Sequence, residues 1–368
     1  MRQCSLLLLL LTALLTHNLH AQDAKWYDGI TLHGMAASSF TWNFNTPASG
    51  ENGYRIFDKK HNSFTPDVFQ LAIAKDAENS GDAGFRADVI TGMLPMYTAS
   101  AGMFGSTNID LLQAYASYVA PIGSGLRLDM GKFTTHMGYE LIEGCDGYND
   151  NISRSFLFGY AIPFAHTGLR ARYAFSDAVS GMLMVANGWD NAVENNSNKT
   201  IGAQLAVAPM EQLSLFANVI HGTEFADNNS DATTVMDFVA VWSLSELLSV
   251  GANVDLGSAA GAAAEGEDAA WTGFAGYVRL NLHEQFSLAL RGEMFDDTDG
   301  LRTGMKQKLT EITVTPEFRP AEQFVIRADL RYDMSDQKVF EDGDSFESVT
   351  LENADSQFTF GLQMLFLF

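Results

Sequence analysis

The sequence predicts an all-β fold: a transmembrane antiparallel up-and-down β-barrel of about 16 strands, with roughly 14 to 18 possible. Three observations predict it. Apolar and polar residues alternate over segments of about ten residues, as they do where successive side chains of a strand point to opposite faces. Short connections alternate with long polar ones along the chain. The arginines within the expected strands fall on the face opposite the aliphatic residues.

The N-terminal stretch predicts export. MRQCSLLLLLLTALLTHNLHAQ has one arginine, an apolar run from Leu6 to Leu15, and Ala21 at a plausible cleavage point. This pattern is typical of a secretory signal peptide, here residues 1–21. Residues 22–368 are then expected to form a single barrel domain with long extracellular loops, and they keep one cysteine, Cys145.

The composition narrows the class of protein. Charged residues are 18% of the chain, below the roughly 25% of soluble domains. Acidic residues outnumber basic ones by 45 to 22, which argues against nucleic acid as a partner because nucleic-acid binders are basic. After the signal peptide no stretch approaches ~18 consecutive apolar residues, so no helical membrane span is expected.

The alternating segments give the expected strands. In FVIRADLRYD (324–333), for example, Arg327 and Arg331 take one parity and the aliphatic residues take the other. An even strand count puts both termini on the side of the short turns, which is the periplasm. The expected strands are 29–43, 67–76, 83–92, 109–120, 126–137, 166–176, 179–188, 200–209, 213–224, 233–243, 247–257, 270–281, 286–296, 307–318, 324–334 and 357–368.

Lipid gives the physical reason for a closed sheet. Every backbone donor and acceptor in hydrocarbon must be paired within the protein, so the sheet must close on itself. An arginine on the lipid face would cost about 2–4 kcal/mol at mid-bilayer, and we therefore expect the arginines to line a wet lumen. These candidate pore-lining residues are Arg86, Arg127, Arg170, Arg172, Arg279, Arg291, Arg327 and Arg331.

Two interpretations of these arginines remain open. They can act on permeating ions as a set, or each can pair locally with a carboxylate of the lumen wall. The acids on the same face are Asp88, Asp129, Glu293, Asp329 and Asp333.

The C-terminal stretch SQFTFGLQMLFLF places an aromatic-rich set of apolar residues on one face of the last expected strand. We expect this face, which runs from Phe358 to the terminal Phe368, to contact outer-membrane lipid.

The central block resembles a known family. Its pieces QAY, GKFTTHMGYE, SRSFLFG, IPFAHTGLR and NGWDN are similar to the OmpL-like β-barrel porins of Gram-negative bacteria, and the similarity is clearest over residues 110–210. The resemblance implies an outer-membrane channel that passes small hydrophilic solutes, without a defined substrate and without catalytic residues. The strand ending at Phe368 also resembles the outer-membrane assembly signal, which implies the barrel-assembly machinery as a partner. A homo-oligomer is possible for such a protein.

The loop 138–165 is the candidate constriction. If it folds into the lumen, its carboxylates are expected to face wall cations such as Arg127, Arg170 and Arg172, and such a transverse field filters solutes by size and charge. The alternative is a solvated acidic loop outside the barrel. The aromatic residues of SFLFGY (155–160) are expected to anchor the loop at the membrane interface, or else to line a pore. The candidate acids are Glu140, Glu143, Asp146 and Asp150.

Catalytic, metal and cofactor motifs are not evident. The histidines after the signal peptide lack H-E-x-x-H or paired-ligand spacing, and no G-x-S-x-G elbow occurs. The acidic clusters at 296–300 and 341–347 depart from a calcium-loop pattern. The leading interpretation is a passive diffusion porin that is not an enzyme and has no cofactor. The alternatives are a barrel without a channel that acts in adhesion, an outer-membrane hydrolase, and a secreted β-sandwich.

Overall fold

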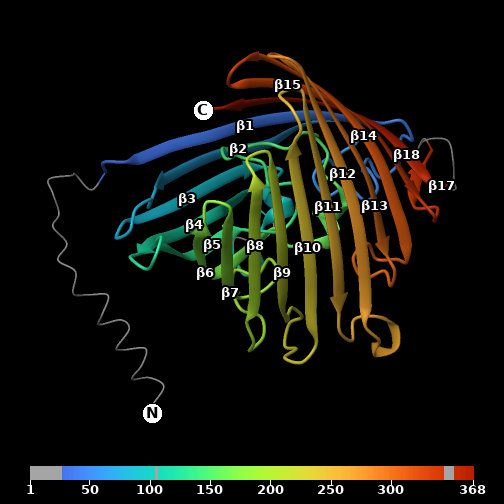
Figure 1. Ribbon diagram of the computed structural model, residues 1–368. Helices are drawn as coiled ribbons and strands as arrows, with labels where there is room; N and C mark the ends of the chain where they lie inside the picture. Colours follow the sequence, from blue (N-terminus) through green and yellow to red (C-terminus); the bar gives the residue numbers. More distant parts are fainter. Residues whose placement is uncertain (1–26, 104–106, 344–351) are drawn as a thin grey trace. The chain divides into compact units, whose positions relative to one another are not determined.

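A computed structural model describes residues 27–103, 107–343 and 352–368. The compact unit Thr31–Phe368 contains a closed barrel in which each strand pairs with its neighbours in sequence order and β18 lies between β15 and β1 (Figure 1). The short strands β16 and β17 pair separately. The signal peptide expected over residues 1–21 lies outside the described residues.

The barrel strands have the following bounds. They are β1 Ile30–Asn43, β2 Ser63–Lys75, β3 Ala83–Gly92, β4 Ile109–Ala120, β5 Leu126–Thr134, β6 Ala165–Ser176, β7 Val179–Ala186, β8 Thr200–Met210, β9 Leu213–Thr223, β10 Ala232–Ser243, β11 Leu248–Ala259, β12 Ala269–His283, β13 Phe286–Asp297, β14 Gln307–Ala321, β15 Phe324–Ser335 and β18 Ser356–Leu367. The remaining elements are β16 Phe340–Asp342, β17 Glu352–Ala354, the helix α2 Pro95–Thr98, the π-helix η1 Leu157–Ala161 and the 3-10 turn η2 Ala264–Gly266.

The predicted fold class and strand order are confirmed, and the boundaries differ at a few strand ends. The second strand begins at Ser63 rather than at 67. It therefore includes Pro66, which has no N–H to donate, but the Pro66 carbonyl accepts a hydrogen bond from the Met93 amide at 3.0 Å. The fifth strand ends at Thr134 rather than at 137. It stops there because the chain turns inward, through Gly138 with a φ of 88°.

The two faces of each strand follow the predicted parity. On β18, Gln357, Thr359 and Gln363 are buried inside the barrel, while Met364 and Phe366 are exposed on the outer face. The strand arginines lie on the inner face, where each one meets a carboxylate. No helix among the described residues is long and apolar enough to cross a membrane.

The barrel closes at the very end of the chain. Gly34 and Phe368 exchange backbone hydrogen bonds of 2.8 and 3.0 Å, which complete the pairing of β1 with β18. The Phe368 ring covers Gly34 so closely that a Cβ at position 34 would overlap it. A glycine is therefore required opposite the terminal aromatic residue.

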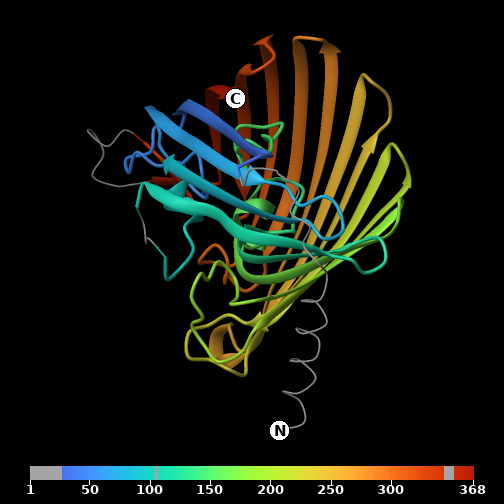
Figure 2. The ribbon, with the colours of Figure 1, turned by 90° about the vertical axis from the view of Figure 1, so that its left-hand side faces the viewer.

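An apolar core lies inside the barrel, where the segment between β5 and β6 packs against the wall. Figure 2 shows this green chain within the ring of strands. Phe156, Leu157 and Phe158 are fully buried there, in one cluster with Trp271 and Phe295 of the wall. The prediction that SFLFGY anchors the loop at the membrane interface is therefore wrong; these side chains fix the loop to the inside of the wall.

We predict that arginine is costly on the outer face and tolerated on the inner face of one strand. Leu205→Arg, at the middle of β8 on an outer-face position that is 48% exposed, should lower the free energy of unfolding by about 2–4 kcal/mol. The control is Ala206→Arg, whose side chain would enter the lumen, with an expected change of about 1 kcal/mol or less. Denaturant unfolding in lipid vesicles measures both, and equal losses would contradict the assignment of faces.

Candidate functional site

The inner loop, which we define as residues 135–164 between β5 and β6, crosses the lumen to the far wall. The Gly138 amide donates to Asp237 of β10 at 3.1 Å, and the Tyr139 amide donates to Asn253 of β11 at 3.0 Å. The Tyr139 ring then stacks on Tyr277 of β12, with 3.9 Å between ring centroids. The chain leaving β5 is thus fixed to β10, β11 and β12 within five residues of the end of its strand.

Two acids of the inner loop form buried ion pairs with wall arginines. Glu140 lies 2.6 Å from Arg291 of β13. Glu143 lies 2.5 Å from Arg327 of β15 and 3.0 Å from Arg154, which belongs to the loop itself. All five side chains are nearly inaccessible to solvent. Removing one partner would therefore leave a buried charge without compensation.

Two further acids form ion pairs that face the open part of the lumen. Asp146 lies 2.7 Å from Arg86 of β3, and Asp150 lies 2.6 Å from Arg279 of β12. The Asp146 side chain is 60% exposed. Because exposed ion pairs contribute little to stability, these two pairs orient the loop tip. The attachment of the loop to the wall depends on the buried pairs of Glu140 and Glu143.

Wall carboxylates also hold the backbone of the inner loop. Asp329 of β15 accepts hydrogen bonds from the amides of Ile152 and Ser153 at 3.1 and 2.8 Å. Glu293 of β13 accepts from the amides of Phe156 and Leu157 at 2.5 and 3.1 Å. Buried amides of an irregular segment need such acceptors. The acids of β13 and β15 therefore hold the loop backbone, just as the arginines of these strands hold its acidic side chains.

The return of the inner loop to β6 is held by an aromatic and cationic cluster. The Trp271 indole donates to the Ala161 carbonyl at 3.1 Å, and Arg302 donates to the Tyr160 carbonyl at 2.6 Å. The Arg302 guanidinium lies over the rings of Trp189 and Trp271, 4.5 and 5.3 Å from their centroids. This cation–π arrangement joins three loops around η1.

Asp190 holds the last residues of this return. Its carboxylate accepts from the amides of Phe164 and Ala165 at 2.7 and 2.8 Å. Burial raises the pKa of Asp190 to about 6, although both amide hydrogen bonds act in the opposite direction.

The structure places three predicted partners of the loop acids elsewhere. Arg127, Arg170 and Arg172 all pair with Asp129 of β5, at 2.9, 2.9 and 2.6 Å. The expectation that they face the loop carboxylates is therefore wrong. Asp129 stands directly opposite Arg170 in the β5–β6 register, so the nearest carboxylate takes these cations. The alternative of local pairing is confirmed here, and also for Arg86 with Asp88 and for Arg331 with Asp333.

Two arginines outside the strands join the same network. Arg55, in the segment between β1 and β2, reaches Asp333 at 2.6 Å and the Thr359 hydroxyl at 3.0 Å. Arg154 of the inner loop pairs with Glu143, and its backbone carbonyl accepts from Arg331. Strand parity carries no signal for loop residues, which is why sequence reasoning missed Arg55 as a site residue.

An open space of about 740 Å³ remains between the inner loop and the wall. Gln70 of β2, Gln113 of β4 and Thr134 of β5 line one side, while Tyr139 and Asp146 of the loop line the other. Closer to the short turns, the side chain of Arg172 is 43% exposed. The loop therefore leaves an open space at its side, lined by both polar and apolar side chains, rather than filling the lumen there.

The histidines near this space have structural contacts. His166 lies 3.1 Å from the Thr135 hydroxyl and 3.3 Å from the Gly188 carbonyl. Burial lowers the pKa of His136 to about 3, so this side chain is neutral. Within the described ranges no three His, Cys, Asp or Glu residues gather as metal ligands. Part of the acidic cluster at 341–347 lies outside the described residues.

A closed barrel with an apolar exterior, a charged lumen and a loop fixed across it defines an outer-membrane channel. The comparisons agree with this class. The model of the family described as "Putative beta-barrel porin-2, OmpL-like" matches residues 29–368. The chain therefore belongs to the OmpL-like β-barrel porin family, and it is an outer-membrane channel for small hydrophilic solutes.

Solved structures share the fold at low sequence identity. The anion-selective porin from Comamonas acidovorans aligns with a TM-score of 0.63 at 11% identity, over 92% of this chain and 99% of that one. The channel DcaP of Acinetobacter baumannii gives 0.61 at 10%, over 92% and 97%. The trimer form of in-vitro folded OmpT of Vibrio cholerae gives 0.60 at 10%, over 92% and 99%. The comparison with curated protein sequences finds no match.

We predict that Glu143→Gln releases the inner loop and exposes Cys145. The change leaves Arg327 and Arg154 without their buried counter-charge, at a cost of about 3–5 kcal/mol. Burial, together with Asp146, raises the pKa of the Cys145 thiol to about 11, so labelling by a maleimide at pH 8 should be slow in the parent protein. It should become at least tenfold faster in the variant.

The control for this prediction is Asp150→Asn, which breaks a partly exposed pair of the same loop and should cost about 1 kcal/mol or less. Its effect on the labelling rate should be less than about threefold. Equal labelling rates in Glu143→Gln and in the parent protein would show that the buried pair does not hold the loop.

We predict a pH-dependent gain in stability from Asp190→Asn. Because the pKa of Asp190 is raised to about 6, the folded protein binds this proton more tightly than the unfolded chain does. The carboxyl group therefore costs little stability near pH 4; the loss grows as the pH rises from about 4 and is complete above about pH 6. The variant should match the parent near pH 4 and exceed it at pH 8 by up to about 3 kcal/mol. Thermal unfolding in detergent at both pH values measures this; a constant difference would contradict it.

Proposed function

We propose that this channel works by passive diffusion and that the inner loop sets its aperture. Solutes would pass through the open space between the loop and the wall of β2, β4 and β5. The single observation that supports this most is the attachment of the loop to the opposite wall, through the ion pairs of Glu140 with Arg291 and of Glu143 with Arg327. A loop held on one side leaves a passage of fixed width on the other.

The pairing of charges supports selection by size more than by charge. Every predicted pore-lining arginine has a carboxylate within 4 Å, so the fields of the two groups largely cancel at a distance. Of the predicted pore-lining arginines, Arg172 and Arg127 keep the most exposed side chains, and both share Asp129 with Arg170. We infer a weak preference among small ions, set by this cluster and by Asp146 on the loop tip.

Partners follow from the two surfaces of the barrel. The apolar outer face would contact outer-membrane lipid, with the long loops outside the cell and the signal peptide 1–21 removed from a domain of residues 22–368. The strand that ends at Phe368 would be recognised by the barrel-assembly machinery. The similarity to OmpT, described in a trimer form, supports a homo-oligomer. We also propose that the chain is not an enzyme, since its lumen acids and arginines are engaged with one another.

We predict that shortening the loop tip widens the passage. Gly144 and Gly147 form a tight turn with hydrogen bonds of 2.9 and 3.0 Å, so residues 144–148 can be replaced by two glycines without removing Glu140 or Glu143. In planar bilayers the parent should give stable ohmic steps, and the variant should give steps at least 1.5-fold larger. A reversal potential in a salt gradient should show a cation-to-anion permeability ratio within about threefold of one.

The matched control replaces residues 263–267, an exposed stretch between β11 and β12, by two glycines and should leave the conductance unchanged. Unchanged conductance in the loop-tip variant would defeat the assignment of the aperture. Intact insertion without any conductance in the parent protein would favour the alternative of a surface barrel without a channel.

A further inference from the structure

Three arginines of the lumen wall share a single carboxylate where β5 pairs with β6. Arg127 donates to Asp129 Oδ1 at 2.9 Å, and Arg170 and Arg172 donate to Asp129 Oδ2 at 2.9 and 2.6 Å. The Ser117 hydroxyl also donates to Oδ1, at 2.6 Å. Each oxygen of Asp129 therefore accepts two hydrogen bonds, which fills the capacity of a carboxylate. We call Asp129 and its three arginines the β5–β6 cluster, and it has three cations to one anion.

Several N–H groups of the β5–β6 cluster have no acceptor in the protein. Among the hydrogen bonds of the described residues, Arg170 uses only its Nε and Arg172 only its Nη2. Both terminal nitrogens of Arg170 and the Nη1 of Arg172 keep contact with solvent, whereas the Nε of Arg172 is buried and out of reach of a solute. The side chains are 12% and 43% exposed, respectively. Donors of two guanidinium groups are thus open to the lumen.

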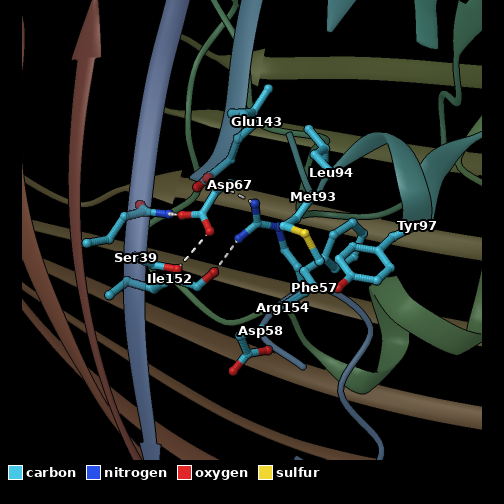
Figure 3. A pocket seen from close by; sticks show the side chains of 12 residues that line it. Ser39, Phe57, Asp58, Asp67, Met93, Leu94, Tyr97, Glu143, Ile152 and Arg154 are labelled. Atoms are coloured by element: carbon cyan, nitrogen blue, oxygen red, sulfur yellow. Dashed lines mark hydrogen bonds and ion pairs between the residues drawn. The ribbon is translucent and has the colours of Figure 1, made fainter. Parts of the chain in front are cut away.

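A contrasting lumen arginine is enclosed by the protein. Figure 3 shows Arg154, which donates to the Ile152 carbonyl at 2.6 Å and lies 3.0 Å from Glu143. Arg327 likewise uses all three of its nitrogens on protein acceptors. Such guanidinium groups attach the inner loop and have no accessible donor for a solute.

The two open guanidinium groups are held in place before any ligand arrives. The central carbon of the Arg170 guanidinium lies 4.2 Å from the centroid of the Phe133 ring and 5.3 Å from that of Tyr115, in cation–π contact. Because Arg170 and Arg172 bond to the same oxygen of Asp129, their guanidinium groups lie side by side. A ligand that bridges them therefore loses little free energy to rearrangement of the site.

The groups in contact with the β5–β6 cluster add no negative charge. His136 and His166 interact with it electrostatically, and the uptake of a proton by either would add positive charge. The turn between β2 and β3 reaches Arg127 through the Ala77 carbonyl, at 3.2 Å. Among the described residues, Asp129 is the only acid within 4.0 Å of the three arginines.

The neighbouring ion pairs leave the β5–β6 cluster with its positive excess. Lys132 of β5 pairs with Asp110 at 2.8 Å. On β3, Arg86 pairs with Asp88 and Asp146 at 2.8 and 2.7 Å, so one acid is in excess there. This single acid is outnumbered by the cations of the cluster, and the wall from β3 to β6 remains positive. The accessible donors and the excess charge both favour an anion.

We propose that the β5–β6 cluster is a docking site for small oxyanions, solutes that carry a carboxylate or phosphate group. Oxygen atoms of the solute accept from the terminal nitrogens of Arg170 and Arg172 in place of lumen water. The planar fork of arginine matches such groups, and charge-assisted bonds of this kind are stronger than neutral ones. A chloride ion is a single atom and cannot occupy both forks. The inference rests on the proposed function, because the solute reaches this wall through the lumen.

Binding is tested by ³¹P NMR, with inorganic phosphate and the purified barrel in detergent at about 20 mM ionic strength, where screening is weak. The phosphate line should broaden saturably at millimolar concentrations. Arg172→Gln should weaken binding roughly 3- to 10-fold, and Arg172→Lys, which keeps the charge but loses the fork, by a smaller factor. Acetate should compete with phosphate better than chloride does at equal ionic strength, and equal competition by chloride would refute recognition of an oxyanion.

The matched control is Arg319→Gln. Arg319 lies at the same end of the lumen with a side chain that is 39% exposed, but Glu317 lies 3.9 Å from it and the Tyr148 hydroxyl accepts its hydrogen bond. Because its charge has a partner of its own, the change should alter phosphate binding by less than about 1.5-fold. Equal weakening by Arg319→Gln and by Arg172→Gln would show general attraction to a basic lumen and would refute the site.

Conductance in planar bilayers separates this site from the channel itself. Phosphate should reduce the potassium chloride conductance of the parent saturably, and that of Arg172→Gln less. If the parent conducts but the phosphate line stays sharp, or broadens equally with Arg172→Gln, the docking site is refuted and the diffusion channel stands. If phosphate binding depends on Arg172 but the parent gives no ohmic steps, the site is supported and the proposed diffusion is refuted.

Discussion

The pairing of buried guanidinium groups with carboxylates inside the barrel is the interaction on which the rest of the structure depends. Arginines are excluded from the outer face by lipid, and inside the wall they are compact, planar donors that match carboxylates well. Arg291 and Arg327 hold the inner loop through Glu140 and Glu143, while Asp329 and Glu293 take its amides. The same charged side chains therefore form the polar inner face of the wall and attach the loop that narrows the lumen.

The inner loop combines this polar network with an apolar core of its own. The π-helix η1 brings Leu157 and Phe158 against Trp271, in a part of the molecule that a water-filled channel would leave wet. Ion pairs exposed to water in the lumen would contribute little to stability. The apolar contacts of η1 stabilise the loop by burying hydrophobic side chains against the wall. The ion pairs in turn are strong only where this core excludes water around them.

Sequence alone could predict the barrel, its strand order and the inward face of every strand arginine, because side-chain parity and the cost of charge in lipid act locally along the chain. It could not predict which acid meets which arginine. Arg127, Arg170 and Arg172 turn to Asp129, a neighbour across strands, whereas Arg291 meets Glu140 from a loop 151 residues away in sequence. The inward position of SFLFGY and the reach of Arg55 depend on the path of a loop, for which no periodicity exists.

The seam between Gly34 and Phe368 has a consequence for the order of assembly. The hydrogen bonds of this seam join the first strand of the barrel to the last, so β1 keeps one edge unpaired until β18 has been placed beside it. A chain that lost its final residues would leave that edge permanently bare within the membrane, where nothing but another protein can pair it.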